Sequence, residues 1–350
     1  MMNRVIKGRG AHYNPANRFE PLHIELDADA VESNFPERHE TQYFIDTSRT
    51  ILAKNDSPDI PVTYSINPYR GCEHGCIYCY ARPTHEYLGF SSGLDFETKI
   101  MVKPDAPSLL EKVFRKPSWQ PQTIAFSGNT DCYQPVEKKL RITRDCLKVF
   151  LHYRNPLGMI TKNDLVLRDL DILQDLIQYN LLTIRISVTT LDNKLCRIME
   201  PRTASPKMRL KAISKLAKAG IPVSVNIAPI IPAINESEIS RIAKAASEAG
   251  AGSASYIMVR LPHKNKELFQ KWLEVHFPKR ANKVLNAIRS TRDDELYKSE
   301  FHTRMRGTGP RADLIRDVFT MACRKYSLNK NFPPLSTEHF RRKPSQIMLF

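Results

Sequence analysis

The sequence predicts an α/β fold in which six strand–helix units form a partial (β/α)6 barrel. Two observations predict this fold. Short β-branched or apolar runs alternate with longer helical patterns, which is typical of parallel βαβ units with right-handed crossovers. Two of the helical patterns end in glycine, the usual residue just past a helix C-terminus. A parallel array of this kind gathers its chemistry at the carboxyl ends of its strands.

The first segment of the chain, residues 1–60, is polar, acidic and interrupted by prolines, so we expect an irregular extension. The barrel core is expected over residues 61–262. Its strands are predicted at residues 62–66, 123–127, 157–161, 182–189, 222–227 and 255–259. Helices are predicted at residues 138–153, 167–179, 206–219 and 236–249. The remaining residues, 263–350, are predicted to be mostly helical and basic.

The net charge of +16 is unevenly distributed along the chain. Residues 261–350 carry 19 Lys/Arg against 9 Asp/Glu, whereas residues 1–60 carry 7 against 10. Positive charge gathered in one segment can attract the phosphates of a polyanion, although a solvated basic surface is the ordinary alternative. Nucleic acid is therefore a candidate partner. Within the basic segment, Arg304, Arg306 and Arg311 stand beside two glycines and could line a phosphate path or form a solvated loop.

Hydropathy bears on the location of the protein. No run approaches the roughly 20 apolar residues that cross a bilayer, and residues 1–10 lack the apolar stretch of a secretory signal. We therefore expect a cytoplasmic protein without membrane contact. Its seven cysteines are then expected to be reduced or metal-bound rather than paired in disulfides.

The loop that follows the first predicted strand carries the strongest chemical signal. Cys72, Cys76 and Cys79 lie within eight residues, in the order Cys-x-x-x-Cys-x-x-Cys. Such a loop can bring three thiolates around one iron–sulfur cluster, with Gly71 and Gly75 relieving backbone crowding. Three protein ligands on a four-iron cluster leave one iron open to a substrate or cofactor. The spacing thus predicts a [4Fe–4S] cluster.

A structural zinc site is the main alternative for these cysteines. Such a site normally has four ligands in two pairs. The nearest fourth ligand is His74, which lies inside the tight turn and would compete poorly for the metal. A disulfide is disfavoured in a cytosolic chain.

The cysteine spacing, together with Tyr78 before the last cysteine, resembles the radical S-adenosylmethionine (radical SAM) superfamily. The resemblance implies a partial TIM-type barrel. It also implies that S-adenosylmethionine binds the open iron and is split by electron transfer into a 5′-deoxyadenosyl radical, which abstracts a hydrogen atom. An external electron donor of the flavodoxin or ferredoxin type would then be a partner. In this division of labour the cofactor carries the difficult chemistry and the protein directs it.

Finer matches over about residues 63–262 are similar to spore photoproduct lyase and its uncharacterised relatives. Tyr78 and Tyr80 flank the last cysteine as in the lyase, where the tyrosines lie near the adenosyl group and are implicated in radical transfer. The match after the second strand implies that Thr130 lies near the cofactor.

The resemblance also implies that Lys162, Ser187 and Ala228 contact the cofactor, the alanine against the adenine. All three stand at the ends of predicted strands, where a parallel array gathers its site residues. Lys162 would supply a cation and Ser187 a hydroxyl to a zwitterionic ligand. Each also has an ordinary structural interpretation, as a solvated lysine, a serine bonded to backbone and a packing alanine.

The chain departs from the lyase at one position. Where the lyase has a cysteine that returns a hydrogen atom to the product radical, this chain has Gly128. Cys132, four residues further on, is a candidate for a displaced donor, and burial in the core is its alternative. The departure puts thymine-dimer repair in doubt, though not radical generation.

Three functions follow from these observations. The first is a radical SAM enzyme that acts on nucleic acid, as in spore photoproduct lyase-like DNA repair. The second keeps the radical but modifies a peptide, tRNA or metabolite. The third is a nucleic-acid-binding protein with a structural or sensing iron–sulfur cluster, a hypothesis disfavoured by the cofactor-like motifs on the later strands.

Overall fold

The computed structural model describes residues 5–19 and 40–342. Within these ranges, seven strands form the main sheet, in the order β10-β9-β8-β7-β6-β3-β2. All neighbouring pairs are parallel except β2 and β3. The strands of this sheet are β2 (Leu52–Lys54), β3 (Tyr64–Ile66), β6 (Ile124–Phe126), β7 (Leu157–Thr161), β8 (Leu182–Ser187), β9 (Val223–Ile230) and β10 (Ser253–Met258).

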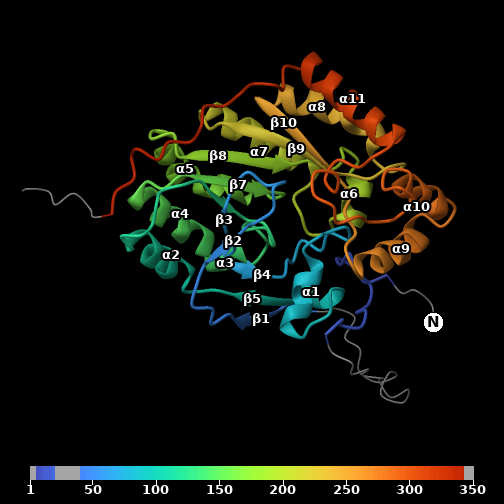
Figure 1. The fold of residues 1–350 in the computed structure, drawn as a ribbon, viewed down its shortest axis with the longest axis horizontal. Helices are drawn as coiled ribbons and strands as arrows, with labels where there is room; N and C mark the ends of the chain where they lie inside the picture. Colours follow the sequence, from blue (N-terminus) through green and yellow to red (C-terminus); the bar gives the residue numbers. More distant parts are fainter. Residues whose placement is uncertain (1–4, 20–39, 343–350) are drawn as a thin grey trace, which may run out of the picture.

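Helices cover the outer side of this sheet (Figure 1). Successive helices pack against one another, α2 on α4, α4 on α5, α7 on α8 and α8 on α11. The α-helices are α1 (Leu94–Thr98), α2 (Ala106–Arg115), α3 (Glu137–Leu140), α4 (Ile142–Tyr153), α5 (Leu170–Ile177), α6 (Asn193–Met199), α7 (Pro206–Lys218), α8 (Ile239–Glu248), α9 (Asn265–His276), α10 (Ala281–Arg289) and α11 (Pro310–Lys325). The 3₁₀ helices are η2 (Arg82–Leu88), η3 (Asp164–Asp169) and η4 (Glu236–Glu238). The predicted partial (β/α)6 barrel is thereby confirmed.

The limits of several elements differ from the prediction for local reasons. The helix predicted at residues 138–153 is interrupted at Arg141, whose φ of 57° lies in the left-handed region. The helix predicted at residues 167–179 begins as the 3₁₀ turn η3. β9 continues to Ile230, three residues beyond its predicted end.

A second, smaller sheet adds to the barrel, in the order β1-β5-β4. It consists of β1 (Gln42–Ile45), β4 (Tyr69–Arg70) and β5 (Lys99–Val102). β1 and β2 both fall in the segment expected to be irregular, residues 1–60, of which residues 1–4 and 20–39 lie outside the described part. Each is a short edge strand that pairs with a strand elsewhere in the chain, as Gln42 pairs with Lys99. Strands of three or four residues are too short to show a strand-like alternation of apolar and polar residues.

A strap formed by residues 300–306 spans the opening of the partial barrel between its two edge strands. On one side the Met258 N–H of β10 donates to Met305 O at 2.9 Å. On the other side Arg304 forms an ion pair with Asp59, in the loop between β2 and β3. The strap therefore closes a gap that the sheet leaves open.

The three arginines considered for a phosphate path are all engaged within the protein. Arg304 forms the strap's ion pair. Arg306 lies over the Tyr256 ring, 4.2 Å from its centroid, and donates to Tyr256 O at 3.0 Å. Arg311 forms an ion pair with Glu236, with Nε 3.1 Å from Oε2. These internal contacts leave the phosphate path without structural support.

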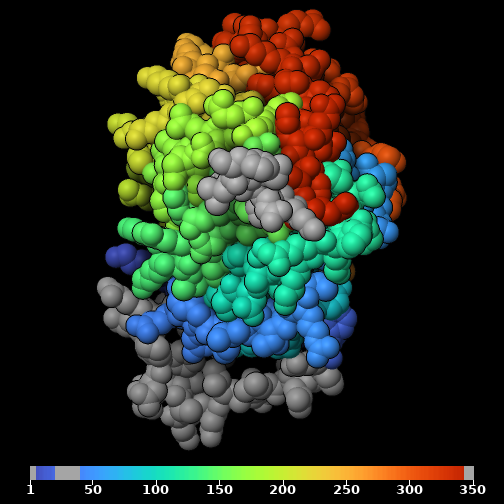
Figure 2. Space-filling model, turned by 90° about the vertical axis from the view of Figure 1, so that its left-hand side faces the viewer, coloured from blue at the N-terminus to red at the C-terminus, as the bar shows by residue number. Residues whose placement is uncertain are grey.

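After α11 the chain runs back over the outer helices, as the red segment across the green core in Figure 2 shows. The Ser336 N–H donates to Asn180 O at 2.9 Å, and the Arg341 N–H donates to Tyr153 O at 3.0 Å. Among the described helices, none is long and apolar enough to cross a membrane.

Candidate active site

The cysteine loop begins directly after β4, and its backbone conformation requires glycine at two positions. Gly71 has a φ of +76°, and a Cβ there would stand 2.9 Å from Phe96 O. Gly75 has a φ of +66°, and a Cβ there would stand 2.7 Å from a carboxylate oxygen of Glu97. The Cys72 N–H donates to Phe96 O at 2.9 Å. The loop therefore wraps tightly around α1 because two of its residues lack side chains.

None of the three cysteines of this loop forms a disulfide within the described chain. Cys72 and Cys76 are buried and Cys79 is half-buried. Burial raises the pKa of the Cys76 thiol, and the charge of Glu200 adds to the rise. Burial also raises the pKa of Cys79, which Cys72 reinforces.

These thiols fit the iron–sulfur cluster that their spacing predicts. Bound iron would offset the cost of ionising crowded, buried thiols, because the metal supplies the positive charge. Within the described ranges, no three His, Cys, Asp or Glu side chains converge on a point suited to one metal ion. A cluster makes a different demand, since it spreads its thiolates over separate iron atoms.

The buried ion pair of Arg82 and Glu97 supports the cysteine loop. Arg82 is fully buried, donates from Nε to Cys76 O at 3.0 Å and pairs with Glu97. Glu97 also accepts the Gly10 and Ala11 N–H groups at 3.0 and 2.8 Å. The described part of the N-terminal segment thus belongs to the support of the cysteine loop. Sequence reasoning missed this role, because the two segments lie far apart in the chain.

Tyr78 is buried and donates its hydroxyl to the Glu200 carboxylate. Thr189 Oγ1 donates to the same carboxylate at 2.7 Å, and Arg209 forms an ion pair with it. Burial raises the pKa of Glu200, and the charge of Arg209 opposes that rise. The Ile77 N–H donates to Met199 O at 3.0 Å. These contacts hold the Tyr78 ring between the cysteine loop and the residues that follow β8.

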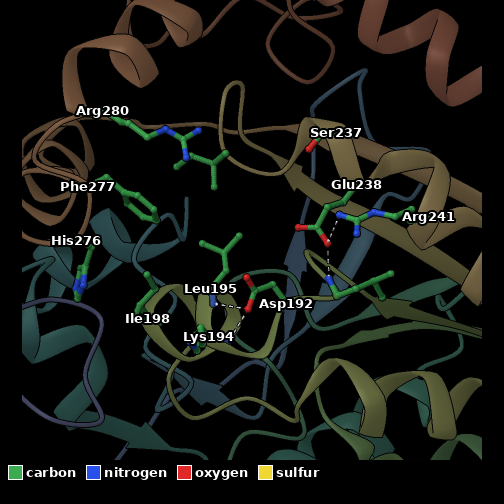
Figure 3. A pocket seen from close by; sticks show the side chains of 12 residues that line it. Asp192, Lys194, Leu195, Ile198, Ser237, Glu238, Arg241, His276, Phe277 and Arg280 are labelled. Carbon is green, nitrogen blue, oxygen red and sulfur yellow. Dashed lines mark hydrogen bonds and ion pairs between the residues drawn. The ribbon is translucent and has the colours of Figure 1, made fainter.

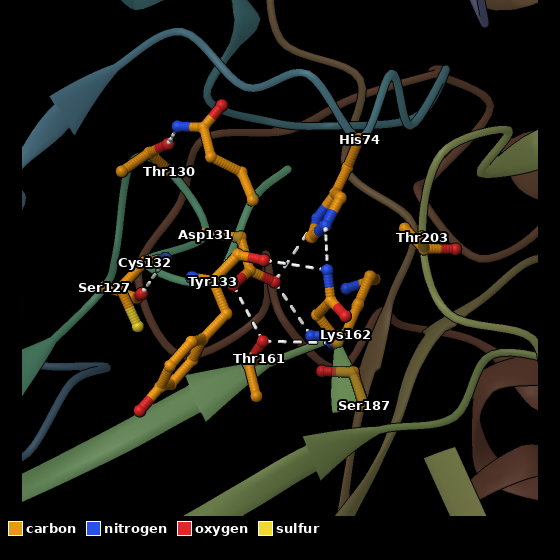
Figure 4. A network of polar contacts seen from close by, with 12 residues as sticks. His74, Ser127, Thr130, Asp131, Cys132, Tyr133, Thr161, Lys162, Ser187 and Thr203 are labelled. Atoms are coloured by element: carbon orange, nitrogen blue, oxygen red, sulfur yellow. Dashed lines mark hydrogen bonds and ion pairs between the residues drawn. The ribbon is translucent and has the colours of Figure 1, made fainter. Parts of the chain in front are cut away.

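Asp131 joins the loops that follow β6 and β7 to the cysteine loop (Figure 4). Its carboxylate accepts from Thr161 Oγ1 at 2.7 Å and from the Lys162 N–H at 2.8 Å. The His74 Nδ1 lies 3.4 Å from Asp131 Oδ2. Although burial opposes the shift, the charge of His74 lowers the pKa of Asp131 to about 2. The pair thereby fixes the backbone from which the Lys162 side chain extends.

The predicted cofactor contacts at Lys162 and Ser187 are adjacent. The register of β7 and β8 pairs Thr161 with Ile186, so Lys162 and Ser187 follow at neighbouring strand ends, as Figure 4 shows. The Lys162 Nζ lies 6.0 Å from the centroid of the Tyr78 ring. The Ser187 hydroxyl is buried and has no hydrogen-bond partner among the described residues. Because a buried hydroxyl without a partner is costly, this atom fits a site that a polar ligand completes.

Thr130 lies in the loop that follows β6, and Ala228 lies within β9, two residues before its last residue. Thr130 Oγ1 donates to Gly71 O at 2.6 Å and accepts from Gln134 Nε2 at 3.0 Å. Its hydroxyl is thus already bonded to the cysteine loop. Ala228, on β9, is buried, and its carbonyl oxygen lies 3.1 Å from Thr189 Oγ1.

Tyr80 and Cys132 occupy contrasting environments. Tyr80 is 45% exposed and donates its hydroxyl to Gly128 O. Cys132 is fully buried in the main apolar core, and its N–H donates to Ser127 Oγ at 2.9 Å. Burial is also the main cause that raises the pKa of the Cys132 thiol. These observations favour the structural interpretation of Cys132 over the displaced donor.

Arg209 was not among the predicted site residues, although its position in the sequence carries a signal. It lies on the buried stripe of α7 with Pro206, Ile213 and Leu216, at the spacing of three or four residues that marks the inner face of a helix. An arginine on such a stripe requires a buried partner, and here that partner is Glu200.

A cavity of about 530 Å³ lies outside this site, between α6, η4 and the end of α9 (Figure 3). Two of its acidic side chains are bonded within the protein. Asp192 accepts the Lys194 N–H at 2.7 Å, and Glu238 accepts the Leu191 N–H at 2.8 Å. None of the predicted site residues lines this cavity.

Comparison with known sequences identifies relatives of the chain. Residues 66–246, more than half of the chain, match the family model of the Radical SAM superfamily. An uncharacterised protein of Mycobacterium tuberculosis is 32% identical over 232 residues, which cover 66% of this chain and 68% of that protein. An uncharacterised protein of Methanocaldococcus jannaschii is 28% identical over 223 residues, or 64% of this chain and 80% of that protein.

Comparison with solved structures agrees with the fold. Spore photoproduct lyase complexed with dinucleoside spore photoproduct aligns with a TM-score of 0.59 at 18% identity, over 81% of this chain and 79% of that protein. A variant of the lyase with bound AdoMet and dinucleoside spore photoproduct aligns with a TM-score of 0.58, also at 18% identity, over 81% of this chain and 79% of that protein. At this level of identity the likeness shows a shared fold.

Proposed function

This chain belongs to the radical SAM superfamily, and from that premise we propose that it cleaves S-adenosylmethionine at a [4Fe–4S] cluster held by Cys72, Cys76 and Cys79 and acts on nucleic acid. Membership makes the chain a radical SAM enzyme and implies both the cluster and S-adenosylmethionine. When bound, the cluster supplies the electron that breaks the sulfonium C–S bond and so yields a 5′-deoxyadenosyl radical. The electron would come from an external donor of the flavodoxin or ferredoxin type.

The observation that carries the cofactor site is the buried hydroxyl of Ser187 beside Lys162, which has no hydrogen-bond partner in the described ranges. A hydroxyl and an ammonium group at neighbouring strand ends suit the polar methionine end of the cofactor. Ala228, within β9, offers a small apolar surface to the adenine. Thr130 has a supporting part, because its hydroxyl already bonds to the cysteine loop.

The two tyrosines have different parts in this proposal. Tyr78 is fixed by Glu200 and Arg209, so its ring forms a rigid wall beside Lys162 and excludes water from that side. Tyr80 is partly exposed and forms the rim on which a substrate would rest. A fixed wall and an open rim are what a site needs in order to shield a radical while admitting a large substrate.

Nucleic acid is supported as the substrate by the basic residues 261–350 and by the shared fold with a lyase that binds a dinucleoside photoproduct. Gly128 bears on the reaction itself. A Cβ there would have Ser65 Oγ as its nearest neighbour, at 4.0 Å. The position of the lyase's donor cysteine therefore has room for a side chain but lacks the thiol. A peptide, tRNA or metabolite is the alternative substrate.

The proposed cofactor chemistry is tested by anaerobic reconstitution with iron and sulfide, followed by dithionite and S-adenosylmethionine. The wild-type protein is expected to release 5′-deoxyadenosine, and Cys79→Ala to release none above background. Cys323→Ala, which removes a buried cysteine from α11, is the matched control and should retain the activity. Wild-type protein that binds four irons yet forms no 5′-deoxyadenosine would refute the proposal.

The substrate is tested with the dinucleoside spore photoproduct, a tRNA pool and a peptide library, each added to the reconstituted enzyme. Deuterium transferred from a labelled substrate into 5′-deoxyadenosine identifies the molecule that loses a hydrogen atom. Gly128→Cys supplies a thiol where the structure has space, so it should raise the yield of repaired thymines if the photoproduct is a substrate. Deuterium transfer from the peptide or the tRNA alone would reject DNA as the substrate.

A further inference from the structure

Two arginines near the rim of the site have no acidic partner within residues 5–19 and 40–342, and sequence reasoning did not single them out. Arg260 follows the end of β10, and Arg292 lies just beyond α10. Among the described residues, neither forms an ion pair, and the Nε atom of each is buried without a hydrogen-bond partner. By contrast, the buried Arg82 and Arg209 each form an ion pair with a carboxylate, Arg82 with Glu97 and Arg209 with Glu200.

Arg260 stands next to the cysteine loop. Its guanidinium lies over the Tyr80 ring, 4.9 Å from the centroid, and Tyr80 directly follows a cluster cysteine. The Val259 N–H donates to Ile230 O at 2.9 Å, which fixes the backbone at this strand end. Because the ring covers one face of the guanidinium, the outer edge remains for a ligand.

Arg292 is 2% exposed, and its two terminal nitrogens donate hydrogen bonds to backbone carbonyls. Nη2 donates to Val259 O at 3.0 Å and Nη1 donates to Thr303 O at 3.2 Å. It thus ties the strap to the end of β10. Burial, followed by the charge of Arg260, lowers the pKa of Arg292 to about 10. The charge of Arg260 thus acts on Arg292, and neither cation has a counterion from the described chain.

We propose that Arg260, backed by Arg292, binds a phosphodiester group of the substrate at the rim formed by Tyr80. An oxyanion would accept hydrogen bonds from the guanidinium edge and offset the repulsion between the two cations. The proposal rests on the proposed function, since it assigns the substrate class to the same site. It also explains why the rim is built from a tyrosine and an arginine, which suit a base and a phosphate respectively.

The test measures the binding of two matched ligands to the reconstituted enzyme by calorimetry. One is the dinucleotide TpT, which has a single phosphodiester, and the other is its neutral methylphosphonate analogue. The wild-type protein should bind TpT about tenfold to hundredfold more tightly, as expected for a charge-assisted contact. Arg260→Met should abolish this preference, and Arg260→Lys should retain part of it. Arg324→Gln, which removes a charge from the exposed face of α11, should leave the preference unchanged.

Several outcomes would overturn the inference. Equal binding of the two ligands by the wild-type protein would exclude a phosphodiester contact. If Arg324→Gln lost the preference for TpT to the same extent as Arg260→Met, the preference would arise from net charge rather than from Arg260. If Arg260→Met abolished the change that S-adenosylmethionine causes in the electron paramagnetic resonance spectrum of the cluster while TpT binding persisted, the arginine would belong to the cofactor site. Failure of the enzyme to form 5′-deoxyadenosine would instead refute the proposed function, and the ligand preference would still test the inference.

Discussion

Replacing Arg209 with methionine should destabilise the protein strongly, because it leaves the carboxylate of Glu200 buried without its cation. The two side chains are 1% and 0% exposed, so water cannot take the place of the guanidinium. Removing one partner of a buried pair costs about 3–5 kcal/mol. That is a large fraction of the 5–15 kcal/mol that stabilises a typical domain. Tyr78 should lose its fixed orientation as well, because its hydroxyl donates to the same carboxylate.

The assay is urea unfolding under anaerobic conditions, with the iron content of the compared proteins matched. Arg197→Met removes an exposed arginine from α6 and should change the free energy of unfolding by less than about 0.5 kcal/mol. The double variant Glu200→Gln/Arg209→Met should lose less stability than the sum of its two single variants, since no uncompensated charge remains. A loss below about 1 kcal/mol in Arg209→Met, or additive losses in the double variant, would refute the reasoning.

Three further predictions concern single positions. Ser187→Ala should change the free energy of unfolding by less than about 0.5 kcal/mol, because the hydroxyl has no hydrogen-bond partner in the described part of the chain. The same substitution should weaken S-adenosylmethionine binding about fivefold. A stability loss above about 1 kcal/mol would show that the hydroxyl bonds within the protein. Gly71→Ala should lower the free energy of unfolding by at least about 2 kcal/mol, because the residue has a φ of +76° and no room for a Cβ. The variant should also retain less iron after reconstitution. Full iron retention would contradict this prediction. Burial lowers the pKa of His85 from 6.5 to about 4, so the unfolded chain takes up this proton at a higher pH than the folded protein. The stability that His85 contributes is therefore complete above about pH 6.5 and falls by about 3 kcal/mol as the pH drops to about 4. Unfolding curves of His85→Gln should lack this part of the pH dependence, and an unchanged slope would refute the assignment.

Much of the barrel could be predicted from the sequence, because alternating apolar runs and helix stops depend on neighbouring residues. α7 begins at its predicted residue, where Ser205 accepts the Met208 N–H and Pro206 occupies the first turn. The cysteine loop was recognisable for the same reason, since its spacing lies within eight residues. The roles of Lys162 and Ser187 stay predictions. The structure adds that the two are neighbours and that the serine hydroxyl has no partner in the described chain.

Contacts between distant segments could not be predicted, because no local pattern specifies which of many polar residues will meet. Arg304 and Asp59 are 245 residues apart in the chain, yet their ion pair joins the strap to the loop between β2 and β3. Nothing in the local sequence distinguishes Arg260, and only the fold places its guanidinium over Tyr80, where its charge acts on Arg292. The residue order was therefore sufficient to establish the barrel and the three thiols, which depend on short-range periodicity and spacing. The charged residues around those thiols depend on the tertiary structure. Folding pairs some of these charges, such as Arg82 with Glu97, and leaves others, such as Arg260, without a carboxylate partner among the described residues.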